Sequence, residues 1–261
     1  MKTILVTNDD GYTSAGYVSL LQALSKEYHI IAVVPSTKKS WIGKAVTAYD
    51  TLKITPLSYE GFELYTINGT PADCVQIGLY HIMNSRPDAV ISGINLGTNI
   101  GTARLLSSGT IGAAMEATLA SIPSIAFSLS IPKDIRRTHD LYSKTSVPLF
   151  HSAAEIAQKL SRTLLESNLT KKIFSVNMPY QATISSTLEI TIPFDVGYGP
   201  LFQVSEKQIT HVVPPVEYTD MKKETDLYAM YRGAISVTPL DLSMISLDAV
   251  KTMKEYMKDK W

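Results

Sequence analysis

Two adjacent carboxylates near the start of the chain are the side chains best placed to do chemistry. Asp9 and Asp10 follow a short apolar run at 3–7 and the single residue Asn8, and the run has the composition of a buried strand. Their oxygens are the hard ligands that Mg²⁺, Mn²⁺ and Ca²⁺ prefer. An Asp at a strand end can also cap a helix or shape a turn, so the pair by itself supports both interpretations.

Polar residues at two further strand ends favour a metal site. The apolar run at 29–35 opens into the polar segment 36–40, and the run at 88–92 is followed by Asn95. In open α/β sheets, ligands bind beyond the carboxyl ends of the parallel strands, so these loops are expected to converge on one crevice. Two carboxylates, an amide oxygen and a hydroxyl would form an all-oxygen site for a hard cation.

The residue before the pair excludes one related chemistry. Phosphatases of the haloacid dehalogenase type carry Asp-x-Asp-Gly after the first strand, and their first Asp is the nucleophile. The corresponding position here is Asn8, whose amide is a poor nucleophile. We therefore expect a water molecule, rather than a side chain, to attack the substrate.

The segment 93–101 is rich in glycine and asparagine. Its polar residues Asn95 and Asn99 argue against a membrane-embedded Gly-x-x-x-G helix, and its spacing does not match the dinucleotide fingerprint G-x-G-x-x-G. Because glycine permits positive φ and exposes backbone amides, we expect a loop here that continues through 102–107.

A third polar motif opens a predicted helix over 108–121. Ser108, Gly109 and Thr110 stand at its start, where free amides and the helix dipole favour a phosphate group. Ser108 by itself is equally compatible with an ordinary N-cap. Its position directly after the Gly- and Asn-rich loop favours phosphate binding.

The elements that must position these residues alternate between strands and helices. Further strands are predicted at 62–68 and 124–129, and helices at 15–28 and 72–84. This alternation predicts an α/β fold with a mostly parallel sheet and helices on both faces. The remainder of the chain is predicted to contain a helix at 144–167, strands at 173–179 and 188–193, a Pro-rich extended stretch near 205–216, the segment 228–240 and a final helix at 246–259.

Composition limits the domain count and the partners. No linker or repeat divides residues 1–261, which we expect to form one domain whose part from about 181 to 261 contains a protruding subunit-contact extension. Lys plus Arg equals Asp plus Glu at 24 each. A chain without net charge has no global field to attract nucleic acid polymers or anionic membranes, so we expect a small phosphorylated partner.

Cys74 is the only cysteine, which excludes an intrachain disulfide and a cysteine zinc site. No apolar stretch reaches the roughly 18 residues that a spanning helix needs. The apolar run at 3–7 is also too short for the core of a signal peptide. Together these features predict a cytoplasmic protein.

Several motifs resemble the SurE family of metal-dependent nucleotidases. The matching segments are ILVTNDDG (4–11), GTPADCV (69–75), SGINLGTNIG (92–101), SGTIGAAMEA (108–117) and GAISVTPL (233–240). The resemblance implies a Rossmann-like three-layer fold and hydrolysis of nucleoside 5′- or 3′-monophosphates by metal-activated water. It also implies homodimers or homotetramers that exchange their C-terminal parts.

The resemblance also implies a set of site residues. The cofactor would be Mg²⁺ or Mn²⁺, with Ca²⁺ possible in crystals. The implied metal ligands are Asp9, Asp10, Ser40 and Asn95. The implied phosphate contacts are Asn99, Ser108, Gly109 and Thr110. Of the two carboxylates with catalytic roles, Asp9 is the candidate for orienting or deprotonating the attacking water, and Asp10 is mainly a ligand.

Three departures from the family pattern keep other functions open. Lys39-Ser40-Trp41 replaces the usual Arg-Ser-Gly, and Lys lacks the bidentate fork of Arg. The segment 102–107 is one residue longer and lacks a Tyr, and Arg232-Gly-Ala234 replaces acidic-Gly-Tyr. An alternative hypothesis is therefore a degenerate member that binds metal or nucleotide without efficient turnover. A glycosyltransferase-type use of the acidic pair is a third.

Overall fold

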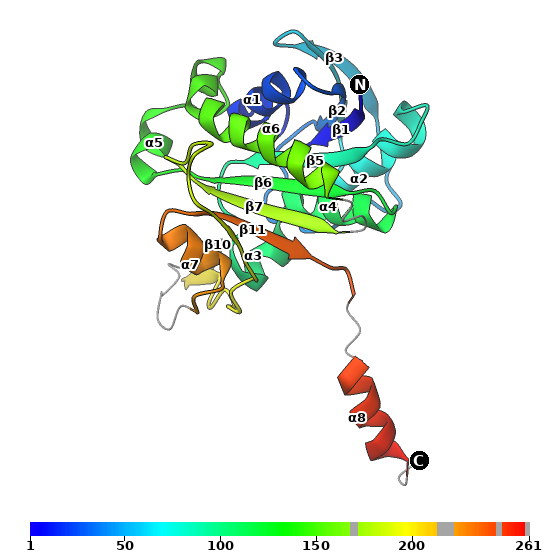
Figure 1. Ribbon diagram of the computed structural model, residues 1–261, viewed down its shortest axis with the longest axis vertical. Helices are drawn as coiled ribbons and strands as arrows, with labels where there is room; N and C mark the ends of the chain where they lie inside the picture. Colours follow the sequence, from blue (N-terminus) through cyan, green and yellow to red (C-terminus); the bar gives the residue numbers. More distant parts are fainter. Residues whose placement is uncertain (168–171, 213–221, 244–246, 259–261) are drawn as a thin grey trace.

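A nine-stranded, mostly parallel sheet forms the centre of the molecule in a computed structural model (Figure 1). The structure describes the chain except residues 168–171, 213–221, 244–246 and 259–261. The strand order is β3-β4-β2-β1-β5-β6-β7-β11-β8. The strands are β1 (Thr3–Thr7), β2 (His29–Pro35), β3 (Ile54–Tyr59), β4 (Phe62–Ile67), β5 (Ala89–Asn95), β6 (Ser124–Ser130), β7 (Ile173–Pro179), β8 (Leu188–Ile190) and β11 (Ile235–Leu240).

The six strands from β4 to β7 in this order run parallel. The antiparallel pairings lie outside them, where β3 pairs with β4 and β11 pairs with β7. Strand β1 lies in the middle of the parallel group, and its residues Ile4, Leu5 and Val6 are fully buried. Parallel strands are covered on both faces, which is why they read in the sequence as continuous apolar runs.

Helices cover both faces of the sheet and complete three layers. Helices α1 (Ala15–Leu24) and α6 (His151–Glu166) pack on one face, in the same hydrophobic cluster as Ile4 and Val6. Helices α2 (Pro71–Ile77) and α4 (Gly109–Leu119) cover the other face, where their apolar residues join Leu5. The predicted α/β three-layer fold is confirmed.

Several predicted helices differ in extent or type. The helix predicted over 72–84 continues beyond α2 as a π-helical turn, η1 (Gly78–Ile82). The one predicted over 144–167 begins as a 3₁₀ helix, η2 (Lys144–Phe150), because Pro148 cannot donate to an α-helical ladder. The loop expected over 102–107 is wrong, since helix α3 (Gly101–Ser107) occupies it. Helix α5 (Lys133–Thr138) was not predicted.

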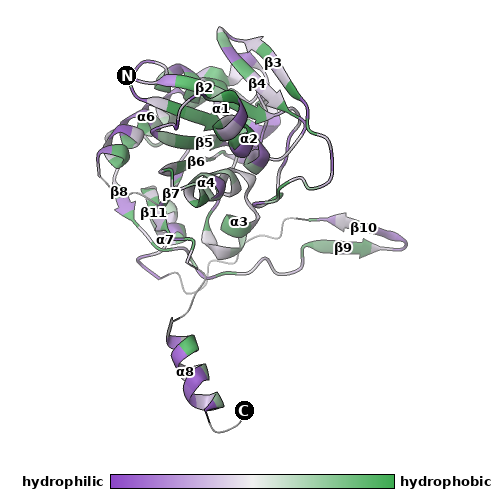
Figure 2. Ribbon diagram, turned by 90° about the vertical axis from the view of Figure 1, so that its right-hand side faces the viewer, coloured by the Kyte–Doolittle hydropathy of each residue, from purple (hydrophilic) through white to green (hydrophobic). Residues whose placement is uncertain are grey.

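The C-terminal part includes two elements that stand apart from the sheet. Strands β9 (Phe202–Ser205) and β10 (Gln208–His211) form a hairpin that projects from the body (Figure 2). Helix α7 (Asp226–Tyr231) precedes β11, and helix α8 (Leu247–Met257) lies away from the main body (Figure 1). Part of the predicted Pro-rich stretch, 213–216, falls outside the described residues. None of the described helices is both long enough and apolar enough to cross a bilayer.

Candidate active site

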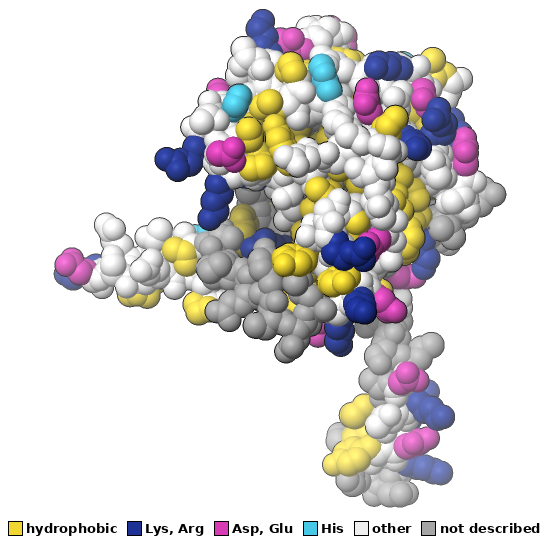
Figure 3. Space-filling view, turned by 60° about the vertical axis from the view of Figure 1, so that its left-hand side comes forward, with side chains coloured by type: hydrophobic (Ala, Val, Ile, Leu, Met, Phe, Trp, Pro, Cys, Tyr) yellow, Lys and Arg dark blue, Asp and Glu magenta, His cyan; other side chains and the backbone are white. Residues whose placement is uncertain are grey.

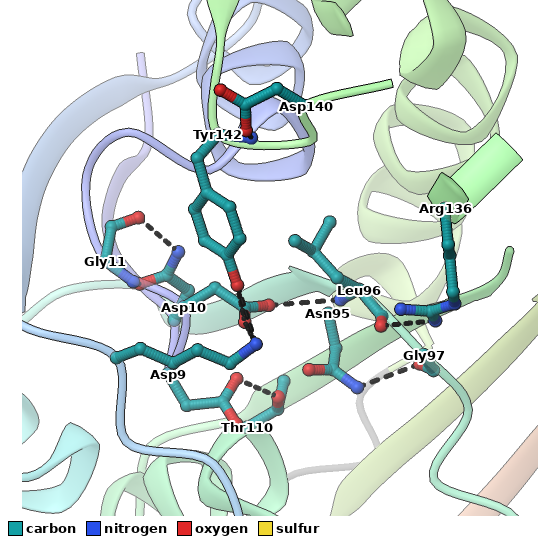
Figure 4. Close-up of polar contacts among 12 residues, drawn as sticks. Asp9, Asp10, Gly11, Asn95, Leu96, Gly97, Thr110, Arg136, Asp140 and Tyr142 are labelled. Carbon is teal, nitrogen blue, oxygen red and sulfur yellow. Dashed lines mark hydrogen bonds and ion pairs between the residues drawn. The ribbon is translucent and has the colours of Figure 1, made fainter. Parts of the chain in front are cut away.

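The turn after β1 sets the direction of the two carboxylates. The side chain of Asn8 is fully buried, its Nδ2 donates to the carbonyl of Gly11 at 2.8 Å, and its Oδ1 accepts from the Gly11 amide at 3.0 Å. Both ends of the amide are thus used to close the turn. This turn presents Asp9 and Asp10 at the carboxyl edge of the central strand, and each is only 4% exposed (Figure 4).

Asp9 is held from the neighbouring helix. The hydroxyl of Thr110 donates to Oδ1 of Asp9 at 2.7 Å. Burial, followed by repulsion from Asp10, raises the pKa of Asp9 from 3.8 to about 7. The carboxylate therefore lacks enough positive charge from the protein to stay ionised at acid pH.

Asp10 has three polar neighbours. Its Oδ2 accepts from the Leu96 amide at 3.1 Å, and its Oδ1 accepts from the Tyr142 hydroxyl at 3.1 Å (Figure 4). The ammonium of Lys38 lies 3.5 Å from the same Oδ1 and donates to the Tyr142 hydroxyl at 2.7 Å. Because half of the Lys38 side chain is exposed, water screens its charge, and it only partly offsets the carboxylate pair.

A pocket of about 490 Å³ opens over the carboxylates. It brings together six of the eight site residues expected from the sequence, namely Asp9, Asp10, Ser40, Asn95, Asn99 and Ser108. The other two, Gly109 and Thr110, lie behind Asp9 at the start of α4. The convergence of three strand ends on one crevice is therefore observed, and the binding roles of these residues remain predictions.

The asparagines at the pocket are fixed by the backbone and by neighbouring strands. The side-chain nitrogen of Asn95 donates to the Gly97 carbonyl at 2.8 Å, which leaves its Oδ1 for a ligand. The side chain of Asn99 donates to Oγ of Ser128 at 2.8 Å, and its backbone amide donates to Oδ1 of Asn177 at 2.8 Å. Strands β6 and β7 thus hold Asn99 in place.

The start of α4 approaches Asp9 so closely that only glycine fits. A Cβ on Gly109 would lie 2.8 Å from Cβ of Asp9 and 3.0 Å from Cγ2 of Ile42. Ser108 caps the helix, since its Oγ accepts from the Ile111 amide at 3.2 Å. The amides of Gly109 and Thr110 make no hydrogen bond within the described part of the chain, so they remain available to an anion.

The loop that carries Ser40 is attached to the body at several points. The Gly43 amide donates to the Ser107 carbonyl at 2.8 Å, and the Thr47 hydroxyl donates to the carboxylate of Asp73 at 2.6 Å. The Thr70 hydroxyl donates to the Ala45 carbonyl at 2.6 Å. These bonds hold the loop against α2 and the end of α3, where Ile42 and Gly43 also lie close to the start of α4.

Comparison with known proteins agrees with this arrangement. The family model described as Survival protein SurE matches residues 4–195. The chain belongs to the SurE family. Proteins called 5′-nucleotidase SurE from Methanocella arvoryzae and Methanocaldococcus jannaschii are 31% and 32% identical to it, and the matches cover 99% of this chain and 98% and 97% of theirs.

A solved SurE structure shares the fold. The crystal structure of the SurE protein from Aquifex aeolicus superposes with a TM-score of 0.80 at 28% identity, covering 98% of this chain and all of the other. The match extends beyond residue 195, where the family model ends.

Four charged or aromatic residues at this SurE-type pocket were missed in the sequence. Lys38, Arg104 and Arg136 line it, and Tyr142 contacts Asp10. The guanidinium of Arg136 donates to the Leu96 carbonyl at 2.6 Å (Figure 4). Lys38 lies in a segment already expected at the site, so its position carried a signal. Arg104 lies in the segment 102–107, between two motifs expected at the site, so its position also carried a signal. Arg136 and Tyr142 come from segments without any motif, and only the fold brings them to the pocket.

The residues at this site fit a divalent cation. Among the described residues there is no group of three or more His, Cys, Asp or Glu side chains, so a cation would depend on two carboxylates and neutral oxygens. Burial and repulsion from Asp10 raise the pKa of Asp9 in the metal-free protein. A bound cation would offset this repulsion and lower that pKa. Oxygen-only ligands suit Mg²⁺, Mn²⁺ or Ca²⁺ rather than a softer metal.

Proposed function

We propose that this SurE-family protein is a cytoplasmic, divalent-metal-dependent phosphomonoesterase that hydrolyses nucleoside 5′- and 3′-monophosphates with water as the nucleophile. The observation that carries the proposal is the buried pair Asp9 and Asp10, which lies at one pocket with the start of α4 packed directly against Asp9. Relatives of nearly equal length are called 5′-nucleotidases, which supports the same activity.

The carboxylates would hold the cation and the attacking water. Asp9, Asp10, Ser40 and Asn95 supply the oxygen ligands. A divalent cation would add positive charge near the phosphoryl oxygens and lower the pKa of a water molecule. Asp9 would orient this water and accept its proton, since its carboxylate lines the pocket in which the cation and the water would be held. Asp10, fixed by Leu96 and Tyr142, would act mainly as a ligand.

The wall beside Asp9, at the start of α4, would bind the phosphoryl group. The free amides of Gly109 and Thr110 and the positive end of the α4 dipole stabilise negative charge at this position. Asn99 and Ser108 line the same pocket and add side-chain polar groups. The guanidinium groups of Arg104 and Arg136 also line it, and within the described residues neither forms an ion pair with a carboxylate. Donors aimed at developing charge are the main catalytic contribution expected of such a wall.

The test is turnover of nucleoside monophosphates and an aryl phosphate with Mg²⁺ or Mn²⁺, compared with chelator-treated protein. Asp9→Asn is expected to lose nearly all activity while keeping its circular dichroism spectrum. Asp50→Asn, a change at an exposed Asp outside the pocket, is the matched control and should retain full activity. Wild-type turnover by Asp9→Asn would refute the proposed role of Asp9.

A second candidate is a degenerate member that binds metal or nucleotide without efficient turnover. Helix α3 and Trp41, both at departures from the family pattern, contribute to the pocket wall, so the substrate-binding part of the site is altered. Saturable nucleotide binding without turnover of any substrate, with either metal, would support this candidate over the enzyme.

The oligomeric state is part of the proposal. We infer a homodimer or homotetramer in which the segment from about 181 to 261 contacts a second copy. Helix α8 carries the exposed apolar residues Val250 and Met253, and the hairpin carries Phe202, Val204 and Ile209. Figure 3 shows the hydrophobic side chains of α8 gathered on one side of the helix and its charged ones on the other. An exposed apolar face of this kind supports a contact with another chain.

A further inference from the structure

Four rings gather at the rim of the pocket. Trp41 lines the pocket beside Ser40 and is 40% exposed. Its ring centroid lies 5.3 Å from that of Tyr198 and 4.9 Å from that of His211, and His211 in turn lies 5.7 Å from Phe202. The loop after β2 and the base of the hairpin therefore meet at Trp41.

The cluster is attached to the pocket wall rather than free in solvent. The hydroxyl of Tyr198 donates to the Ala103 carbonyl of α3, and the Thr102 amide donates to the Phe194 carbonyl at 2.9 Å. Tyr198 and His211 pack against Trp41 and limit its rotation. The indole is thus presented to the pocket as a fixed, partly exposed aromatic surface.

The backbone of Trp41 makes this placement unusual. Its φ is +62°, in the left-handed region that glycine occupies freely and bulky residues rarely adopt. Glycine would form the same loop without strain, since the loop is anchored by Gly43 and Thr47 rather than by the indole. Because the loop does not require a bulky residue at this position, the indole of Trp41 indicates a role other than forming the loop.

The position of Trp41 relative to the carboxylates suits a nucleotide. Trp41 follows Ser40 directly, so their Cα atoms are about 3.8 Å apart and the indole begins within a few ångströms of the proposed metal site. A pocket of about 490 Å³ is large enough for a nucleoside monophosphate rather than for phosphate alone. A ligand with its phosphate at α4 would carry its base towards the rim.

We propose that the Trp41 indole is the stacking surface for the base of the substrate, so that the pocket selects phosphomonoesters that carry a planar aromatic ring. This inference rests on the proposed function and deepens it. Stacking is favourable for every base, because each has a π face, so Trp41 confers preference for nucleotides over sugar phosphates without selecting one base.

The first experiment compares AMP with ribose 5-phosphate, which has the same phosphate and sugar but no base. Removing the stack by Trp41→Leu is expected to raise the KM for AMP about tenfold and to change that for ribose 5-phosphate less than twofold. Trp41→Phe should restore part of the difference. Phe202→Leu is the control, since it removes a ring of the cluster that does not line the pocket. Equal changes in KM for the two substrates would overturn the proposal.

A binding experiment separates this inference from the proposed function. In a Trp261→Phe background, Trp41 is the only indole of the chain. Quenching of its fluorescence by AMP, and not by ribose 5-phosphate at equal occupancy of the site, supports the stack even if the protein hydrolyses neither compound. AMP binding without a change in Trp41 fluorescence would overturn it. Absence of turnover alone would count against the phosphomonoesterase and not against the stack.

Discussion

The hydrogen bond from Thr110 to Asp9 allows a quantitative test of how the protein tunes its carboxylates. Thr110 is fully buried, and its hydroxyl is the only side-chain donor to the Asp9 carboxylate in the described part of the chain. Thr110→Val removes the donor and keeps the shape of the side chain. Hydrogen bonds to charged groups contribute about 1.5–3 kcal/mol, and about 1.4 kcal/mol corresponds to one pKa unit. The pKa of Asp9 in the metal-free protein should therefore rise by about one to two units.

This shift has a defined effect on metal binding. A cation must displace the proton from Asp9, so apparent affinity falls as the protonated fraction rises. With the pKa at about 7, half of Asp9 is ionised at pH 7. A rise of one to two units leaves about a tenth to a hundredth ionised, which weakens binding about 5- to 50-fold. Near pH 9.5 the difference should fall below about twofold, because Asp9 is then largely ionised in both proteins.

The assay is calorimetric titration of Mn²⁺ into substrate-free protein at pH 7 and pH 9.5. Thr110→Ser keeps the hydroxyl and serves as the matched control, with near wild-type binding expected. Circular dichroism verifies that each variant is folded. Equal affinity of Thr110→Val and wild type at pH 7, or an equal loss at both pH values, would refute the electrostatic reasoning.

Further predictions concern stability, packing and assembly. Because the pKa of Asp9 is raised from 3.8 to about 7, its ionisation disfavours the metal-free fold as pH rises through this window. Urea denaturation should therefore show Asp9→Asn to be more stable than wild type at pH 8, by up to about 4 kcal/mol, and similar to it at pH 4. Gly109→Ala should overpack the site against Asp9, which should weaken Mn²⁺ binding and lower the free energy of unfolding by about 1–3 kcal/mol. Gly197→Ala is the control, because a Cβ there meets no atom within 4 Å. It should change neither the calorimetric titration nor the urea denaturation. Removing residues 244–261 should lower the mass measured by light scattering to that of a smaller assembly or monomer, and an unchanged subunit number would contradict the contact proposed for α8.

The buried strands could be predicted because burial dictates their composition. Strands β1, β2 and β7 are apolar runs whose observed bounds equal the predicted ones. Strand β3 was missed for the converse reason. It lies at the edge of the sheet, is largely exposed and contains Pro56, so it carries neither an apolar run nor a clear alternation.

The residues of the candidate site likewise fall into a group that the sequence predicts and a group that it does not. Side chains at the ends of parallel strands meet because the topology requires it, so Asp9 and Asn95 could be placed together from the sequence. Tyr142 lies 132 positions from Asp10 and follows a short helix with no periodic pattern. Its approach depends on how the chain packs after β6, which local propensity does not specify. The rim formed by Trp41 and the hairpin was unpredictable for the same reason.

The position of Asp9 and Asp10 next to the central strand has a consequence for the order in which parts of the molecule open. Strand β1 is bonded to β2 on one side and β5 on the other, so exposing its amides requires disruption of the middle of the sheet. The hairpin strands pair only with each other among the described residues, and apart from the ring contact of His211 with Trp41 their side chains are exposed. In a protomer whose hairpin is not in contact with a second copy, amide hydrogen exchange should therefore be slowest in β1 and fast in β9 and β10. The rim of the pocket can open to admit and release ligands many times for each event that displaces the carboxylates.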